Sequence, residues 1–280
     1  MLEIKANKWH AKIEPKSGGN IVALNYEGCS VYRPLNRENT LKGNPFLCGS
    51  PILFPANRTA NGKFTFEGKV YKLPITEKSS GANLHGMLYK QNFIVKEHSN
   101  NGIELVYENY GEIYPFPFKI ITEYYIKGNS FYQRYEIINI GKTNMPLTFA
   151  LHTTFAEPEF FSVPISSAQE RDIFNIPTGR YIPLTEAEKK YITKAESKDT
   201  EISGYYKSEG RTAQIGFFCY TVSENFDHWI LFNGKGISKL LCVEPQCGKV
   251  NGLNEPNGYR ILRPDENIVF STELKPKQKF

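Results

Sequence analysis

The stretch FKIITEYYIKGNSFYQRYEIINI, residues 118–140, decides the fold. Gly128 separates its two halves, and glycine suits the first central position of a type II′ hairpin turn because positive φ carries no Cβ penalty there. In the first half Lys119, Glu123 and Lys127 share one face, while large apolar side chains share the other. This period of two is typical of half-buried strands. The stretch therefore predicts an antiparallel hairpin with one side in the core.

Three other stretches show the same order of strand, glycine-containing turn and strand, namely residues 21–32, 64–73 and 93–107. Residues 185–196 predict a helix, which begins with the Thr-x-x-Glu spacing of a capping box and is expected in a surface connection. No repeat, low-complexity tract or flexible linker divides the chain. We therefore predict an all-β fold, a single large antiparallel β-sandwich, with residues 1–280 as one domain.

The composition is consistent with this fold and argues against one class of partner, the nucleic acids. The 280 residues include 19 Phe and 17 Tyr, which favour strands and can fill a large core. Basic residues exceed acidic ones by 34 to 29, for a net charge of +5, but they are scattered along the chain. Binding along a nucleic acid requires clustered Lys and Arg, so we expect no nucleic-acid partner.

Two further patterns concern the cellular environment. The N-terminal residues lack the basic-then-apolar pattern of a secretory signal, and no apolar run has the length needed to span a bilayer. We expect a soluble, cytoplasmic protein with no membrane partner. The cysteines are odd in number and include no C-x-x-C pair, which favours reduced, structural thiols. They are Cys29, Cys48, Cys219, Cys242 and Cys247.

Four polar side chains stand next to, or within, strongly apolar stretches. Glu244 follows an apolar run and precedes a loop rich in Pro, Gly and Asn. An acid in that place is either paired or used, because an unpaired charge beside a core is costly to desolvate. Arg58 follows another apolar strand, His85 lies in a turn, and His152 lies within an aromatic strand. A carboxylate and an imidazole are groups that general acid–base catalysis uses near neutral pH.

Each of the four also has an ordinary structural interpretation. Glu244 would be a structural acid that pairs with an arginine or accepts hydrogen bonds from backbone amides. His152 would be a core histidine whose hydrogen bonds are made within the core. Arg58 would face solvent, and His85 would be a turn residue. The remaining histidines match no motif and are interpreted as surface or structural residues: His10, His98 and His228.

Taken in order, these stretches resemble the aldose 1-epimerase family, also called galactose mutarotases. The resemblance spans roughly residues 44–265 and depends on a series of motifs: Asn57-Arg58, Gly62-Lys63-Phe64, His85-Gly86, His152 and Glu244-Pro245-Gln246. Members of that family adopt a large two-sheet β-sandwich, the galactose mutarotase-like supersandwich, with the sugar site on the concave sheet face. The resemblance implies the same architecture here.

The resemblance also implies a reaction, the interconversion of the α and β anomers of a hexose. A base removes the proton of the C1 hydroxyl while an acid protonates the ring oxygen, the ring opens, and closing reverses these roles. Glu244 would be the base and His152 the acid, with Arg58 and His85 binding the sugar. The implied partner is a small-molecule sugar, with no cofactor and no metal ion. We expect a monomer or a homodimer, between which the sequence does not choose.

Two departures from the family pattern concern sugar specificity. The family commonly has a sugar-binding aspartate between the strand histidine and the terminal glutamate, where this chain has Ser203. Asp172 and Asp227 are possible substitutes. After His152 the chain reads Thr-Thr-Phe instead of the usual aromatic-Asn. Aromatic residues near these stretches are candidates for stacking on the sugar: Phe54, Phe155 and Trp229.

Other functions compete with this interpretation. A hexose-6-phosphate 1-epimerase of the same fold would call for a basic cluster, for which Arg33 and Arg37 are candidates. A non-catalytic carbohydrate-binding protein would keep the groove but would not need an acid and a base together. A glycoside hydrolase needs two carboxylates, and Glu157 and Glu159 are the nearest second acids to the His152 motif. Metal-dependent hydrolysis is disfavoured because H-x-H and H-E-x-x-H spacings are absent.

Overall fold

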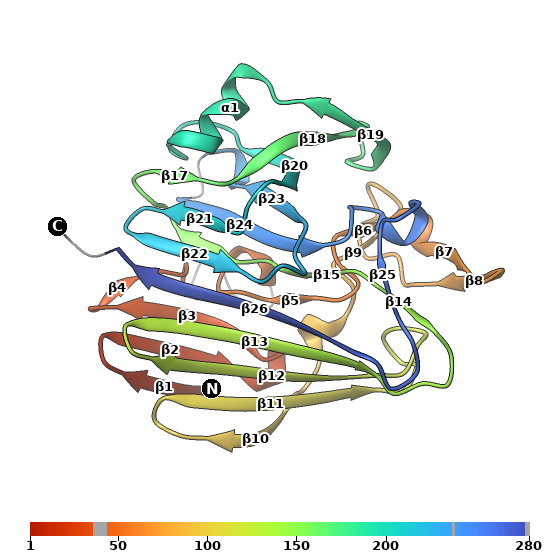
Figure 1. Cartoon of the computed structure of the whole chain (residues 1–280), viewed down its shortest axis with the longest axis horizontal. Helices are drawn as coiled ribbons and strands as arrows, with labels where there is room; N and C mark the ends of the chain where they lie inside the picture. The colour runs from red at the N-terminus through yellow and green to blue at the C-terminus, as the bar shows by residue number, and fades with distance from the viewer. Residues whose placement is uncertain (36–43, 237–238, 278–280) are drawn as a thin grey trace.

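Two large antiparallel sheets make up most of the computed structural model, which describes residues 1–35, 44–236 and 239–277 (Figure 1). The first sheet has eight strands. In spatial order they are β10 (Ile94–His98), β11 (Gly102–Asn109), β12 (Phe118–Lys127), β13 (Ser130–Asn139), β26 (Asn267–Pro276), β22 (Phe218–Val222), β21 (Thr212–Ile215) and β17 (Phe161–Ser162). The expectation of an all-β, antiparallel fold is thereby confirmed.

The second large sheet also has eight strands. In spatial order they are β19 (Pro177–Pro183), β18 (Ile165–Arg171), β20 (Ser203–Ser208), β23 (His228–Phe232), β24 (Leu240–Cys247), β15 (Phe149–Leu151) and β5 (Ile52–Leu53), and β16 (Thr154–Ala156) pairs with β24 beside this path. In this sheet β24 pairs with β23 on one side and with β15 and β16 on the other. Strands far apart in the sequence are therefore neighbours.

The hairpin predicted from residues 118–140 forms as β12 and β13. Lys127 lies opposite Ser130 across the turn, and Gly128 has a φ of 59°, as the type II′ turn requires. Buried and partly exposed positions alternate along β12 up to its last residue. The buried face carries the large side chains that the alternation indicates: Phe118, Ile120, Tyr124 and Ile126.

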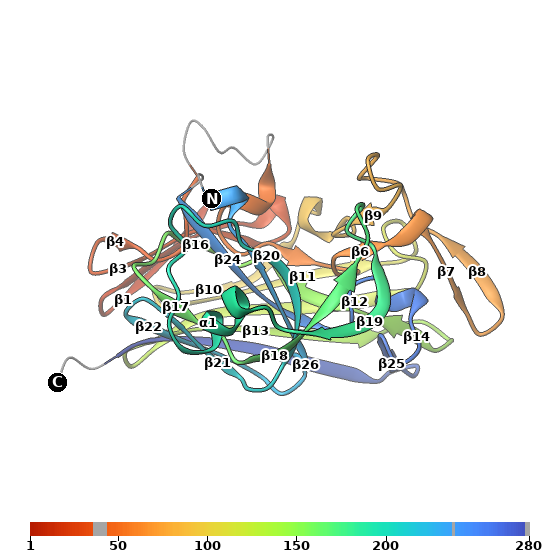
Figure 2. The same cartoon turned by 90° about the horizontal axis from the view of Figure 1, so that it is seen from above.

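Smaller sheets complete the strand set. They are β1 (Leu2–Ala6), β2 (Trp9–Glu14), β3 (Asn20–Tyr26) and β4 (Cys29–Ser30) in one sheet, and the pairs β14 (Met145–Leu147) with β25 (Arg260–Leu262), β6 (Arg58–Thr59) with β9 (Asn83–Leu84), and β7 (Lys63–Phe66) with β8 (Lys69–Lys72). Figure 2 shows β7 and β8 projecting from one end of the molecule. The three predicted glycine hairpins correspond to β3–β4, β7–β8 and β10–β11.

The predicted helix forms as α1 (Glu186–Thr193), which is shorter than expected at its C-terminal end. Thr185 is its N-cap, and the reciprocal hydrogen bonds of a capping box join Thr185 and Glu188. Among the described residues, short 3₁₀ turns lie at Pro15–Ser17, Pro45–Leu47, Ala60–Gly62, Leu88–Lys90, Gly234–Gly236 and Gly252–Asn254. In Figure 1, α1 lies at the edge of the molecule beyond β18 and β20, which agrees with a surface connection.

A continuous hydrophobic cluster joins the sheets and runs from Ile4 to Leu274 in the sequence. One domain over residues 1–280 stays a prediction. Phe54, Phe155 and Trp229 belong to it and are at most 1% exposed. The expectation that they stack on a sugar is therefore wrong, because their rings pack between the sheets and do not reach an open face.

Two further predictions concern the state of the cysteines and membrane-spanning segments. All five cysteines are unpaired thiols; Cys29 is exposed, Cys219 is partly buried, and the other three are buried. Within residues 1–35, 44–236 and 239–277, no helix is both long and apolar enough to cross a membrane.

Candidate active site

A row of residues crosses the second sheet and carries the candidate acid. Tyr205 on β20 pairs with Ile230 on β23, and Ile230 pairs with Glu244 on β24. Glu244 lies in the middle of β24, which continues to Cys247, and not at a strand end as the sequence predicts. The strand continues because β23 pairs with it through Gln246. The Glu244 side chain is consequently held at a fixed place on the sheet and is 2% exposed.

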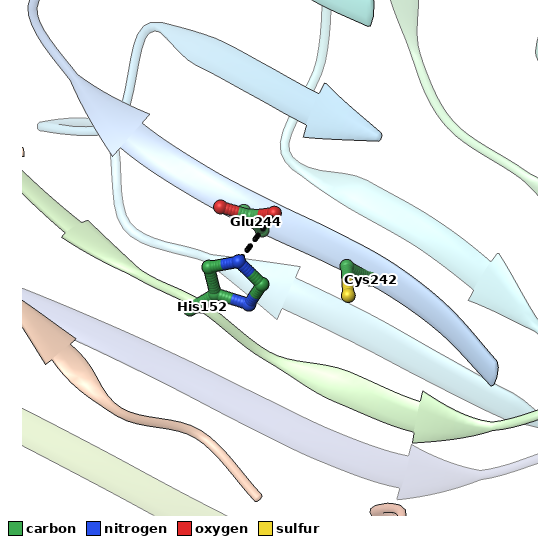
Figure 3. Close-up of side chains that lie close together, drawn as sticks. All are labelled: His152, Cys242 and Glu244. Carbon is green, nitrogen blue, oxygen red and sulfur yellow. Dashed lines mark ion pairs between the residues drawn. The ribbon is translucent and has the colours of Figure 1, made fainter. Parts of the chain in front are cut away.

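His152 lies in the break between β15 and β16, and not within a strand as the sequence predicts. Its backbone N–H donates to the carbonyl of Pro51 over 2.9 Å, and the Thr153 carbonyl accepts from the N–H of Val243 over 2.9 Å. The first bond ties the segment between β15 and β16 to the residue before β5, and the second holds it against β24. The imidazole consequently lies beside the carboxyl of Glu244, with Nε2 and Oε1 3.3 Å apart (Figure 3).

Burial is the main influence on the protonation of both groups. It raises the pKa of the Glu244 carboxyl well above its usual range, against the opposing charge of Arg58. Burial also lowers the pKa of the His152 imidazole to about 3. Both shifts favour the uncharged forms, a protonated carboxyl beside a neutral imidazole, so that one proton is available to the pair.

Arg58, on β6, is not solvent-facing, because its guanidinium is engaged on three sides. Nε donates to Oε2 of Glu77 and Nη2 donates to Oε1, each over 2.7 Å. Nη1 donates to the hydroxyl of Tyr205 over 2.7 Å. Glu77 lies in a loop of ordinary polar composition, so no sequence signal marks it. The bidentate pair with Glu77 fixes Arg58 beside Tyr205, at one end of the row of Tyr205, Ile230 and Glu244.

His85 lies in the predicted turn, with a φ of 65°, and is buried. Gly86 follows because a Cβ there would come 1.9 Å from the carbonyl oxygen of Phe54. The His85 ring packs edge-on to that of His152, with centroids 5.2 Å apart. Burial, with the positive charge of Arg58 acting in the same direction, holds the pKa of His85 well below its usual range, so this second imidazole is also neutral.

These four residues line one cleft of about 280 Å³, so the structure brings together the whole predicted set. The cleft also receives Asn57 of the Asn57-Arg58 motif and side chains that the sequence does not predict, among them Phe46, Glu77, Arg171, Asn175 and Tyr205. Phe46 supplies the partly exposed aromatic face, with its ring centroid 4.5 Å from that of His85. The arrangement can hold a small polar ligand between a proton-sharing pair and several hydrogen-bonding groups.

Ser203 also lines the cleft, whereas neither proposed aspartate substitute does. Asp172 accepts from the backbone N–H groups of Phe174 and Ile176 and thereby closes its own turn. Asp227 binds His228 Nδ1 over 2.6 Å, and it also pairs with an arginine of β25. The expectation that either acid replaces the aspartate is wrong, because both are occupied outside the cleft.

The residues of the competing functions lie elsewhere. Arg33 donates to the carbonyl of Leu47 over 2.9 Å and does not line the cleft, while Arg37 lies outside the described residues. Glu157 and Glu159 line a different cleft, so neither is a second acid for a glycoside hydrolase at this site. The other histidines are structural or peripheral: His10 pairs with Glu3, His98 bonds the Glu3 backbone, and His228 bonds Tyr181 and Asp227.

Cys242 precedes Glu244 by two residues on the same strand, and its sulfur lies near the pair (Figure 3). The ligand-capable atoms of His152, Cys242 and Glu244 all lie within 4.8 Å of one another. Thiolate, imidazole and carboxylate are ligands of zinc. Burial, however, raises the pKa of the Cys242 thiol well above its usual range, which favours the protonated, poorly ligating form of the sulfur.

Comparison with known families gives one match over nearly the whole chain. The family described as aldose 1-epimerase matches residues 1–275. Among curated proteins, the chain is 26% identical over 273 residues to the uncharacterized protein YihR of Escherichia coli K12, covering 90% of this chain and 85% of that protein.

Solved structures show the same fold. A galactose mutarotase-like protein from Clostridium acetobutylicum superposes with a TM-score of 0.91 at 22% identity, covering 99% of this chain and 95% of the other. The galactose 1-epimerase of Lactobacillus acidophilus NCFM superposes with a TM-score of 0.81 at 15% identity, covering 98% of this chain and 93% of the other. The fold expected from the sequence motifs is thereby confirmed.

Proposed function

Because the chain belongs to the aldose 1-epimerase family, we propose that it interconverts the α and β anomers of a hexose through Glu244 and His152. The observation that carries this proposal is the pair itself, whose Oε1 and Nε2 atoms are 3.3 Å apart in a cleft. Ring opening requires one group to accept a proton while another donates one. A pair that shares a single proton can accept one proton and donate another, so the number of protons on the pair does not change.

The reactive state forms when the shared proton moves from Glu244 to His152. The resulting carboxylate accepts the proton of the C1 hydroxyl, and the imidazolium donates its proton to the ring oxygen. The C1–O5 bond breaks and C1 becomes an aldehyde carbon. Rotation about the C1–C2 bond and closure with the roles reversed then yield the other anomer.

Arg58 offsets part of the cost of ionising a buried pair. Two desolvated charges are expensive to create in a protein interior. The positive charge of Arg58 acts to lower the pKa of Glu244, which favours the carboxylate. Glu77 keeps the guanidinium in place, so this charge does not reorganise when the sugar enters.

Sugar binding is assigned to the remaining lining residues. Arg58 and His85 contact the hydroxyls, as the family resemblance implies, and Phe46 offers an aromatic face to the C–H groups of the ring. A non-catalytic carbohydrate-binding protein could use the same contacts. It would have no use for a buried acid and imidazole at 3.3 Å, which favours the enzyme.

The test is the optical rotation of freshly dissolved α-glucose and α-galactose, followed with and without the protein. We expect faster relaxation to the anomeric equilibrium with the wild type and a loss of acceleration in Glu244→Gln. Glu159→Gln is the matched control, because Glu159 is exposed and lines another cleft. Binding of these sugars without acceleration would contradict the epimerase proposal and support the binding protein.

A further inference from the structure

The charges around the cleft do not balance. Arg58 and Glu77 neutralise each other through two hydrogen bonds of 2.7 Å. Burial favours the uncharged forms of Glu244 and His152. Arg171 remains, and it lines the same cleft. Within the described part of the chain, none of the ion pairs involves its guanidinium, so the cleft retains one positive charge.

Arg171 ends β18, where the register with β19 shifts between Gln169 and Arg171. Glu170, which lies in this irregularity, pairs with the exposed Arg180 and does not line the cleft. Arg171 turns toward the cleft, where Nη2 donates to the carbonyl of Ser203 over 2.6 Å and the guanidinium carbon lies 5.0 Å from the ring centroid of Tyr205. The Ser203 bond engages one of five N–H donors, so a planar donor group remains at the cleft wall.

The sheet register gives the separation between the backbone of Tyr205, whose ring lies against this charge, and the backbone of Glu244. Tyr205, Ile230 and Glu244 are successive partners across three strands. Two strand spacings separate the backbone of Tyr205 from that of Glu244, which is about 10 Å. Because the Arg171 guanidinium lies over the Tyr205 ring, we place its charge on the Tyr205 side of the cleft, away from the backbone of Glu244.

We propose that Arg171 binds an anionic group at the end of the sugar remote from C1, so that the substrate is a negatively charged aldose. This inference depends on the proposed epimerase function. A carboxylate or a phosphate ester would present two oxygens to the guanidinium, in the geometry that makes arginine a strong partner for both. A neutral aldose would leave the charge in the cleft without a partner.

The Tyr205 contact offers a purely structural role for the same residue. Arg171 lies over the Tyr205 ring, and the Tyr205 hydroxyl accepts from Arg58. If Arg171 served only to hold this tyrosine, its loss would weaken every sugar equally. The decisive quantity is therefore the ratio of activities on charged and neutral sugars.

The experiment measures anomer exchange at equilibrium by NMR saturation transfer, which needs no pure anomer. The substrates are glucose, glucuronate and glucose 6-phosphate, with the wild type, Arg171→Gln and Arg180→Gln. Arg180→Gln is the matched control, since it removes the same charge from the neighbouring strand but outside the cleft. Calorimetric binding of each sugar is measured in parallel.

We expect the wild type to favour at least one anionic aldose over glucose by about 10- to 100-fold in kcat/KM, the range of charge-assisted hydrogen bonds. Arg171→Gln should remove at least about nine-tenths of that ratio, chiefly through KM, and Arg180→Gln should keep it. Preference for glucuronate alone assigns a carboxylate, and preference for glucose 6-phosphate alone assigns a phosphate.

Two results would overturn the inference. One is a wild type that treats glucose as well as both anions, and the other is an Arg171→Gln variant that loses the same factor on all three sugars. Failure of the proposed function is a separate result. If glucuronate bound in an Arg171-dependent way but no sugar exchanged, the epimerase proposal would fall and the anion site would stand.

Discussion

Two pairs of acid and base face the same cleft and behave in opposite ways. Glu77 meets Arg58 through two hydrogen bonds of 2.7 Å, whereas Glu244 meets His152 at a single separation of 3.3 Å. Although burial alone would raise it, hydrogen bonds from Arg58 and Ser80 hold the pKa of Glu77 below its usual range. Burial without such bonds raises the pKa of Glu244 instead.

The difference separates a fixed charge from a movable proton. A bidentate guanidinium stabilises its carboxylate and cannot give up a proton, since arginine stays protonated. An imidazole at hydrogen-bonding range, with both groups pushed toward neutrality, leaves one proton free to move. We infer that the first pair provides a constant field and the second provides the chemistry.

The largest expected effect comes from removing the movable proton. In Glu244→Gln the amide preserves the shape of the side chain but cannot accept the C1 proton. We expect kcat to fall by about 10²- to 10⁴-fold, the usual range of a general acid or base. Anomer exchange measures kcat, and calorimetry measures sugar binding, which should change little. Retention of wild-type kcat would remove Glu244 from the mechanism.

A smaller loss is expected when the fixed charge is released. Glu77→Gln breaks the bidentate pair and lets Arg58 shift away from Glu244, so kcat/KM should fall by about 10- to 100-fold. Glu170→Gln is the matched control, because Glu170 makes a similar two-bond contact with exposed Arg180, over 2.9 Å and 2.8 Å. An equal effect of the two substitutions would contradict the role given to the Arg58 pair.

The pH dependence should show the shared proton directly. Below the His152 pKa of about 3 the pair gains a second proton and has no base. Above the raised pKa of Glu244 it loses its only proton and has no acid. We expect kcat/KM to stay flat through the range between these limits and to fall on the alkaline side, well above ordinary carboxylate values. An alkaline decline near the usual carboxyl pKa would contradict the burial argument.

The smallest expected effect is on stability. The folded-state pKa of Glu244 is raised above its unfolded value, so the stability that its protonation contributes is complete below the unfolded pKa and is lost as pH rises through the folded one. Glu244→Gln should therefore gain stability relative to the wild type as the pH rises above the usual carboxyl pKa, where His152 is neutral. Each kcal/mol would raise Tm by about 2 °C for a chain of this size. Parallel melting curves that keep a constant Tm difference over this pH range would contradict it.

Local patterns in the sequence were sufficient for much of the fold and for part of the site. The alternation in residues 118–140 identifies β12 and β13, and the Thr-x-x-Glu spacing identifies the start of α1. The motifs around Glu244 and His152 identify the residues that meet, although not their separation.

The rest depends on long-range pairing. Arg171 and Tyr205 reach the cleft only because β18, β20, β23 and β24 are neighbours, and nothing in any one strand states that order. Phe155 and Trp229 face the core because of the register of their strands, which sequence proximity to His152 does not reveal. Glu77 is selected by its geometry with Arg58 and has no motif of its own.

The most direct test of the central claim, that Glu244 and His152 act as one proton-sharing unit, is a double-mutant cycle on anomer exchange. Glu244→Gln, His152→Asn and the double variant are compared with the wild type under one set of conditions. Residues that act as a unit show strongly non-additive losses. We predict that each single substitution lowers kcat about as much as the double substitution. Independent losses that multiply in the double variant, or full activity in either single variant, would contradict the account.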